Sequence, residues 1–248
     1  MDWNPQQYEK FISAREAPFV DLLALIAVRP GMRVVDLGCG PGTLTRKLVE
    51  ALPGAQIVGI DSSASMLQSA AALAGERLTF APGSIEAFAD GGVVGGSFDL
   101  IFSNAALHWV PDHATLLPKL AARLAAGGQL AVQLPADDDN STRTIFADAA
   151  GWRFEMATLD ISAYAQLLYS AGLVEQTVYE KIYPHIMADA DALLEWARGT
   201  ALLPYLDRLP PAQRDPYLDE VRRRLRARHP EKPVFFPFRR IIFYGRRA

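Results

Sequence analysis

Residues 34–42 read Val-Val-Asp-Leu-Gly-Cys-Gly-Pro-Gly, and residues 56–61 read Gln-Ile-Val-Gly-Ile-Asp. This order predicts a strand, a glycine turn, a helix and a second strand that ends in a carboxylate. Glycines let the backbone approach a ligand because no Cβ stands in the way, and an acid at the end of the second strand can accept hydrogen bonds from ribose hydroxyls. The pattern predicts a βαβ unit that binds an adenosine-containing cofactor; the alternative is a crossover whose glycines only make the turn.

The spacing of the glycines separates two classes of cofactor. A dinucleotide fingerprint has the form G-x-G-x-x-G/A, whereas Gly38 and Gly40 are followed by Gly42, one residue early, and Thr43 occupies the third small position. Asp36 precedes the first glycine, where a carboxylate repels a pyrophosphate and attracts a charged amine or a sulfonium. We therefore predict S-adenosylmethionine (SAM), which leaves S-adenosylhomocysteine as product, in place of a nicotinamide dinucleotide.

The composition is that of an ordinary globular protein. The chain has 248 residues, 50% of them hydrophobic and 21% charged, with a net charge of −3, so no overall positive field attracts nucleic acid. Cys39 is the only cysteine, which excludes an internal disulfide. No segment reaches the roughly twenty apolar residues of a membrane span, and the N-terminus lacks a signal-peptide pattern. We expect a soluble cytoplasmic protein; the sequence leaves its oligomeric state open.

Strands and helices alternate through the first half of the chain, which predicts a parallel sheet with right-handed crossovers. The strands are expected at 33–37, 56–60, 78–81, 98–102 and 129–134, and the helices at 43–52, 62–73 and 111–124. Farther on we expect a loop over 137–142, helices over 162–171, 189–206 and 211–228, and strands over 174–183 and 238–244. We interpret the chain as one domain, 1–248, with an N-terminal lid and helix (1–30), a cofactor-binding core (31–136) and a helical cap insertion (186–230) over the carboxyl edge of the sheet.

Ligands of an open parallel sheet lie beyond the carboxyl ends of its strands, which selects the residues just after each strand. Asp61 is the expected ribose acceptor, and Ser62 either adds a contact or caps the next helix. Met66 packs on the adenine or is simply a core residue. Ser84 and Ile85 follow the third strand, where the adenine is expected.

The end of the fourth predicted strand carries a second group of candidates. We expect Asn104 to contact the methionyl end of the cofactor through its carbonyl, and Ala105 to lie beside it. His108 and Trp109 follow at the mouth of the site, where His108 is either a packed structural residue or a base. The four histidines show no metal-ligand spacing, so we expect no metal.

The motifs Asp-Leu-Gly-Cys-Gly-Pro-Gly (36–42) and Gly-Ile-Asp-Ser-Ser (59–63) resemble those of class I SAM-dependent methyltransferases. With 2–5, 102–113 and 130–135, the chain resembles the trans-aconitate 2-methyltransferase family over nearly its whole length. This resemblance implies a Rossmann-like sheet of seven mostly parallel strands, helices on both faces and a helical insertion before the last strand. It also implies a SAM-dependent carboxyl O-methyltransferase that forms the monomethyl ester of trans-aconitate or a similar small polycarboxylate by direct displacement.

The resemblance extends to individual positions. Cofactor contacts are implied for an N-terminal lid that contains Trp3, Asn4, Tyr8 and Phe11. Substrate-positioning candidates are Arg15, His108, Trp109, Trp196, Tyr205 and Arg239, the two arginines being suited to carboxylates. Arg15 and Arg239 are alternatively ordinary ion-pair residues. Two departures from the family pattern are Ser84, where many relatives carry an aspartate, and the altered segment 137–157, whose acids would disfavour a tricarboxylate if they faced the pocket.

Three other functions fit parts of the sequence. A class I methyltransferase with a different small acceptor predicts no cationic side chain near the methyl donor. A SAM-binding protein without turnover would bind the cofactor and form no ester. A nucleic-acid methyltransferase is disfavoured by the acidic charge balance.

Overall fold

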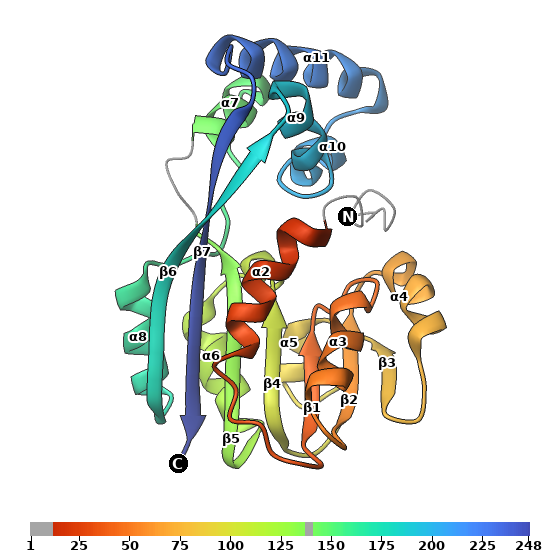
Figure 1. Ribbon diagram of the computed structural model, residues 1–248, viewed down its shortest axis with the longest axis vertical. Coiled ribbons are helices and arrows are strands. Elements are labelled where there is room, and N and C mark those ends of the chain that lie inside the picture. Colours follow the sequence, from red (N-terminus) through yellow and green to blue (C-terminus); the bar gives the residue numbers. More distant parts are fainter. Residues whose placement is uncertain (1–11, 137–140) are drawn as a thin grey trace.

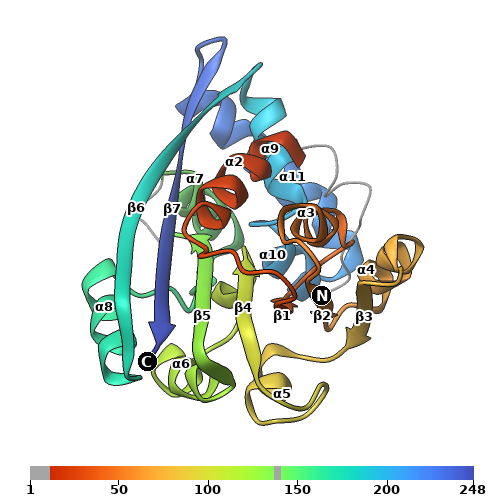
Figure 2. The same cartoon turned by 60° about the horizontal axis from the view of Figure 1, so that its bottom comes forward.

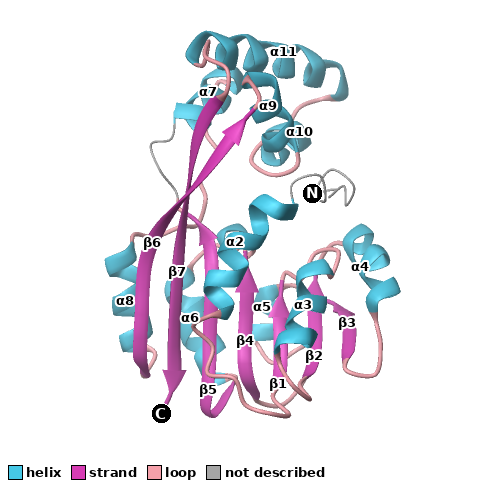
Figure 3. Cartoon of the chain, in the orientation of Figure 1, coloured by secondary structure: helices cyan, strands magenta, loops and turns pink. Residues whose placement is uncertain are grey.

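The computed structural model describes residues 12–136 and 141–248, and the strands of these residues form one seven-stranded sheet (Figure 3). The strands are β1 (Arg33–Leu37), β2 (Gln56–Asp61), β3 (Leu78–Pro82), β4 (Phe98–Asn104), β5 (Leu124–Pro135), β6 (Leu173–Met187) and β7 (Val234–Arg247). Their order across the sheet is β3-β2-β1-β4-β5-β7-β6, and β7 runs antiparallel to both of its neighbours while the other pairs are parallel. The predicted Rossmann-like, mostly parallel sheet is confirmed.

Helices cover both faces of this sheet (Figure 2). The α-helices of the described residues are α2 (Ile12–Leu23), α3 (Thr43–Ala51), α4 (Ala64–Ala70), α5 (Ile85–Ala89), α6 (His113–Ala122), α7 (Ser141–Ala150), α8 (Ile161–Ser170), α9 (Ala190–Arg198), α10 (Leu203–Arg208) and α11 (Pro211–Arg228). Successive residues of β4 point to opposite faces, so Leu100 and Phe102 pack in the core with α2 and α3, whereas Ile101 packs with α5, α6 and α8. A strand buried on both faces requires an unbroken apolar run, which β4 supplies.

The strands β6 and β7 continue past the carboxyl edge of the sheet and carry a separate group of helices (Figure 1). We call α7, α9, α10 and α11 the cap. The cap helices and the outer parts of β6 and β7 enclose a third apolar core, in which Trp196 packs edge-on against Phe238 with ring centroids 4.8 Å apart. The cap therefore lies beyond the carboxyl edge of the sheet, where ligands of parallel sheets bind.

Two local predictions are wrong. The helix expected over 189–206 is two helices, α9 and α10, because Gly199 ends the first and the N–H of Leu202 bonds back to the carbonyl of Ala197. Pro204 then lies in the first turn of α10, where a missing N–H is tolerated. The loop expected over 137–142 is wrong from residue 141, where α7 begins, and 137–140 lie outside the described residues.

Gly38 follows β1 directly, and its substitution tests how closely the glycine turn is packed at the carboxyl edge of the sheet. Its φ is +73°, and a Cβ at this position would lie far inside van der Waals contact with the Cβ of Ala106. We expect Gly38→Ala to lower the free energy of unfolding by about 2–4 kcal/mol, from backbone strain and overpacking together.

The matched control for this substitution is Gly151→Ala. Gly151 has the same φ of +73° with open space around its Cβ position, so the substitution adds only the conformational cost, about 1–2 kcal/mol. Urea denaturation of both variants measures the difference. Equal losses of unfolding free energy in the two variants would show that Ala106 can move aside at no energetic cost.

Candidate functional site

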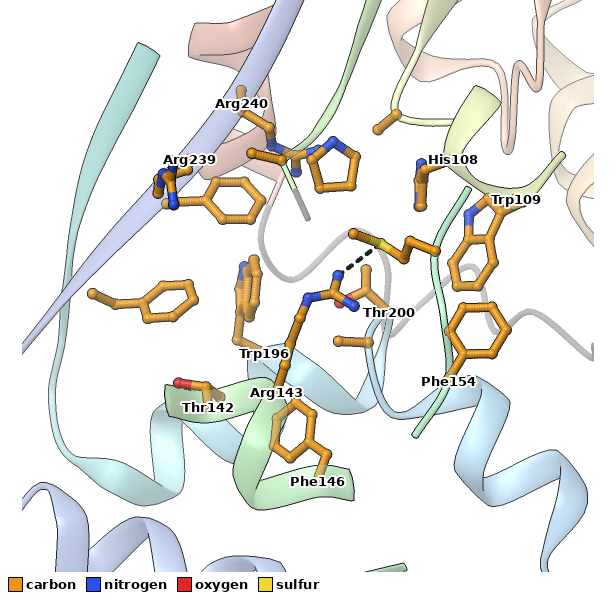
Figure 4. Close-up of a pocket in the computed structure, with 17 residues that line it drawn as sticks. His108, Trp109, Thr142, Arg143, Phe146, Phe154, Trp196, Thr200, Arg239 and Arg240 are labelled. Carbon is orange, nitrogen blue, oxygen red and sulfur yellow. Dashed lines mark hydrogen bonds between the residues drawn. The ribbon is translucent and has the colours of Figure 1, made fainter. Parts of the chain in front are cut away.

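Two cavities meet at the carboxyl edge of the sheet. The larger cavity has a volume of about 480 Å³ and lies among the glycine turn, the end of β2 and the start of α5. The smaller pocket has a volume of about 80 Å³ and lies between the sheet edge and the cap (Figure 4). Three residues line both of them: Ala105, Trp109 and Phe154.

Asp61 is held rigidly at the wall of the larger cavity. The N–H of Gly40 donates to Oδ2 of Asp61 and the N–H of Ser63 donates to Oδ1, both over 2.8 Å. Burial raises the pKa of this carboxyl, and the backbone N–H donors oppose the rise. Asp61 thus faces the cavity as an oriented hydrogen-bond acceptor.

Most cofactor candidates from the sequence come together around the larger cavity. Those that line it are Gly38, Gly40, Asp61, Ser62, Met66, Ser84, Ile85, Ala105 and Trp109. Ser84 also caps α5, since its Oγ accepts from the N–H of Ala87 over 3.1 Å. Trp3, Asn4, Tyr8 and Phe11 lie outside the described residues.

Asp36 lies beneath the glycine turn and does not line either cavity. Its side chain is 4% exposed, and its Oδ2 accepts from the hydroxyl of Thr45 over 2.6 Å. Burial raises the pKa of Asp36 to about 7; the hydrogen bond from Thr45 opposes this rise and the nearby charge of Asp61 adds to it. A cationic ligand above the turn would favour the ionised form.

Asn104 also lies behind the cavity walls. Its Oδ1 accepts from Nε2 of Gln133 over 3.1 Å, and Oε1 of Gln133 accepts from Nη1 of Arg240 over 3.2 Å. These contacts form a buried row of hydrogen bonds from the carboxyl ends of β4 and β5 to the middle of β7.

Three arginines line the smaller pocket: Arg143 from α7, and Arg239 and Arg240 from β7 (Figure 4). Arg240 is 6% exposed, and its Cζ lies 3.8 Å from the ring centroid of Phe238. Arg239 makes a two-point ion pair with Glu180, over 2.6 and 3.0 Å. Sequence reasoning named Arg239 and missed Arg143 and Arg240.

The uncharged polar atoms of this pocket are also informative. Nδ1 of His108, Nε1 of Trp196 and Oγ1 of Thr200 are buried and have no hydrogen-bond partner among the described residues. Burial, reinforced by the charges of Arg240 and Arg143, holds the pKa of His108 well below its usual range, so this imidazole is neutral. Buried polar groups require partners, and the three residues that carry these atoms line the smaller pocket.

Phe154 is a wall residue that sequence reasoning missed, and it lies in a segment without regular structure. Its ring centroid is 5.7 Å from that of Trp109, and its N–H donates to the hydroxyl of Tyr205 over 3.2 Å. Tyr205 therefore supports the wall from the cap and does not line either cavity. Arg15 lies in α2, and its side chain is outside the described part of the structure.

Over residues 12–136 and 141–248, no helix combines the length and apolar character needed to cross a bilayer. Within the same ranges, no three His, Cys, Asp or Glu side chains gather in a group that could hold a metal ion.

Comparisons with known proteins agree with this geometry. A family model described as a methyltransferase domain matches residues 29–191. The chain is 42% identical to the trans-aconitate 2-methyltransferase of Deinococcus radiodurans, over 100% of this chain and 99% of that protein. It is 40% identical to the trans-aconitate 2-methyltransferase of Variovorax paradoxus, over 93% and 91% of the two chains.

The fold is similar to that of solved structures. The YcgJ protein of Bacillus subtilis superimposes with a TM-score of 0.62 at 16% identity, over 94% of this chain and 99% of that one. At this identity the likeness describes the fold alone.

Asp36 gives a test of the charge beneath the turn. Because its folded-state pKa is raised to about 7 from 3.8, the folded protein keeps a proton that the unfolded chain releases, and stability falls as the pH rises between these values. Each pH unit in that interval removes up to about 1.4 kcal/mol. Asp36→Asn still accepts from Thr45 and does not ionise, so it should lack this loss.

Urea denaturation at pH 5 and pH 7 measures the effect. From pH 5 to pH 7 the free energy of unfolding of wild type should fall by about 1–2 kcal/mol more than that of Asp36→Asn. Parallel pH dependences would contradict a raised pKa.

Proposed function

The chain belongs to the trans-aconitate 2-methyltransferase family, and we propose that it transfers the methyl group of SAM to a carboxylate of trans-aconitate or a similar small polycarboxylate. The observation that carries this proposal is the chemistry of the smaller pocket. Arg143 and Arg240 carry N–H donors only, as does the indole of Trp196, and His108 and Thr200 each supply a further polar atom. A ligand that satisfies such a wall is rich in hydrogen-bond acceptors and negatively charged.

The larger cavity fits SAM. Gly38 lines this cavity at the turn, where the backbone passes so close to Ala106 that a side chain is excluded. We assign the ribose hydroxyls to the fixed carboxylate of Asp61 and the adenine to the wall formed by Met66, Ser84 and Ile85. The N-terminal candidates Trp3, Asn4, Tyr8 and Phe11 stay a prediction for the lid.

In the proposed mechanism, the bound cofactor supplies an electrophilic methyl group. A carboxylate is ionised at neutral pH, so the methyl acceptor attacks without a general base. The neutral His108 is therefore not required to take a proton from the acceptor. Arg240 and Arg143 neutralise and orient the carboxylates that do not react. Ala105, Trp109 and Phe154 form the wall common to both cavities, where the attacking oxygen and the methyl group meet and water is excluded.

A carboxylate supplies the acceptor that the buried N–H of Trp196 lacks among the described residues, which favours this class of methyl acceptor over one without carboxylates. The proposal includes a small-molecule substrate, with neither nucleic acid nor membrane as partner. We place the protein in the cytoplasm, which its single cysteine supports.

The direct test incubates the protein with labelled SAM and trans-aconitate and detects the monomethyl ester by mass spectrometry. Citrate and malonate are the matched controls for the number of carboxylates and their geometry. We expect ester from trans-aconitate in preference to both. Binding of SAM without ester from any polycarboxylate would instead support a SAM-binding protein without turnover.

Arg240 gives the sharper test of the methyl acceptor site. Removal of a buried partner of a carboxylate costs about 2–5 kcal/mol, so Arg240→Met should raise the KM for the methyl acceptor at least tenfold and leave SAM affinity unchanged. The neighbouring Arg239→Met is the control, because Arg239 is already paired with Glu180 and is 40% exposed. Equal effects of the two substitutions on this KM would contradict the assignment to Arg240.

A further inference from the structure

We infer that Gln133 is a positioning residue for the methyl acceptor: its amide fixes the guanidinium of Arg240 at the wall of the smaller pocket without cancelling the charge. This inference rests on the proposed function and assigns a role to a residue that lines neither cavity.

The orientation of the Gln133 amide follows from its partners. Gln133 is 1% exposed, and its Oε1 lies 3.2 Å from Nη1 of Arg240 while its Nε2 lies 3.1 Å from Oδ1 of Asn104. A guanidinium has donors and no acceptor, so the amide oxygen must face Arg240 and the amide nitrogen must face Asn104. The hydrogen bonds that join Asn104, Gln133 and Arg240 therefore have one possible arrangement, and all three residues are buried.

Phe238 and Gln133 contact the guanidinium of Arg240 from different directions. The ring of Phe238 lies against the face of the group, with Cζ 3.8 Å from the centroid, and Gln133 accepts from one N–H. The ring restrains the plane and the hydrogen bond restrains rotation within that plane. Arg240 lines the smaller pocket together with His108, so a guanidinium held in this way faces the ligand site.

The two neighbouring arginines of β7 show what an amide achieves here. Glu180 binds Arg239 at two points and compensates its charge. Gln133 binds Arg240 as a neutral acceptor, and this contact leaves the positive charge intact. A guanidinium that attracts an anionic ligand is best held by a neutral partner, because the hydrogen bond then orients the guanidinium and adds no negative charge beside it.

Gln133→Glu tests this role with almost no change in shape. The new carboxylate would pair with Arg240, so we expect the KM for the methyl acceptor to rise about tenfold or more, with SAM affinity and kcat close to wild type. Gln133→Met removes the hydrogen bond and adds no charge, and should raise this KM by a smaller factor. If the glutamate variant fails to fold, the methionine variant still carries the test.

Gln129→Met is the matched control. Gln129 lies on the same strand, is also 1% exposed and bonds to the backbone of Ala27 and the hydroxyl of Tyr244, far from the pocket. It should lose thermal stability like Gln133→Met and keep the wild-type KM. A wild-type KM in folded Gln133→Glu, or equal changes of KM in the two methionine variants, would overturn the inference.

The outcome is separate from that of the proposed function. If wild type forms no ester from any polycarboxylate, the proposed function fails before any variant is compared. If wild type forms the ester and the Gln133 variants keep its KM, only the role of Gln133 fails.

Discussion

The pairing of β6 with β7 is the constraint on which the site depends. The antiparallel register runs from Leu173 opposite Arg247 to Met187 opposite Val234, far longer than any other pairing of the sheet. The pairing of β5 with β7 ends at Pro135 opposite Arg240, and the rest of β7, residues 234–239, stays paired with β6 beyond the end of β5. One strand therefore joins β5 to β6 in the sheet, provides Arg239 and Arg240 to the smaller pocket and packs in the core of the cap, so these parts are coupled through β7.

The two cavities have opposite electrostatic character. Asp61 faces the larger cavity and Asp36 lies beneath it, whereas Arg143 and Arg240 face the smaller pocket. The wall between them is uncharged. A cationic methyl donor and an anionic methyl acceptor are each attracted to their own side and to each other, and an apolar wall leaves that attraction unscreened. The charge pattern thus favours the meeting of two ligands of opposite sign and disfavours two of the same sign.

The sheet could be predicted from the sequence because its signals are local. Buried parallel strands require apolar runs, and the turns after them require glycine, so β1, β2 and β4 follow from residues within a few positions of one another. The cap could not be divided correctly in this way. The break between α9 and α10 lies at Gly199, where the N–H of Leu202 bonds back to the carbonyl of Ala197, whereas the apolar spacing on its two sides is compatible with one continuous helix.

The site shows the same division between local and long-range information. Gly38, Asp61 and Ile85 follow strands of known direction, so a rule about strand ends finds them. Arg239 and Arg240 are adjacent and both line the smaller pocket; alternation along a strand sends their side chains to opposite sides without stating which guanidinium is buried there and which pairs with Glu180. That choice depends on the register with β5, which joins segments about a hundred residues apart, and on the stacking of Arg240 on Phe238. Both interactions lie where β7 extends past the end of β5. The residues of the larger cavity can thus be found from short motifs, whereas the smaller pocket forms only when β7 has paired with β5 and β6.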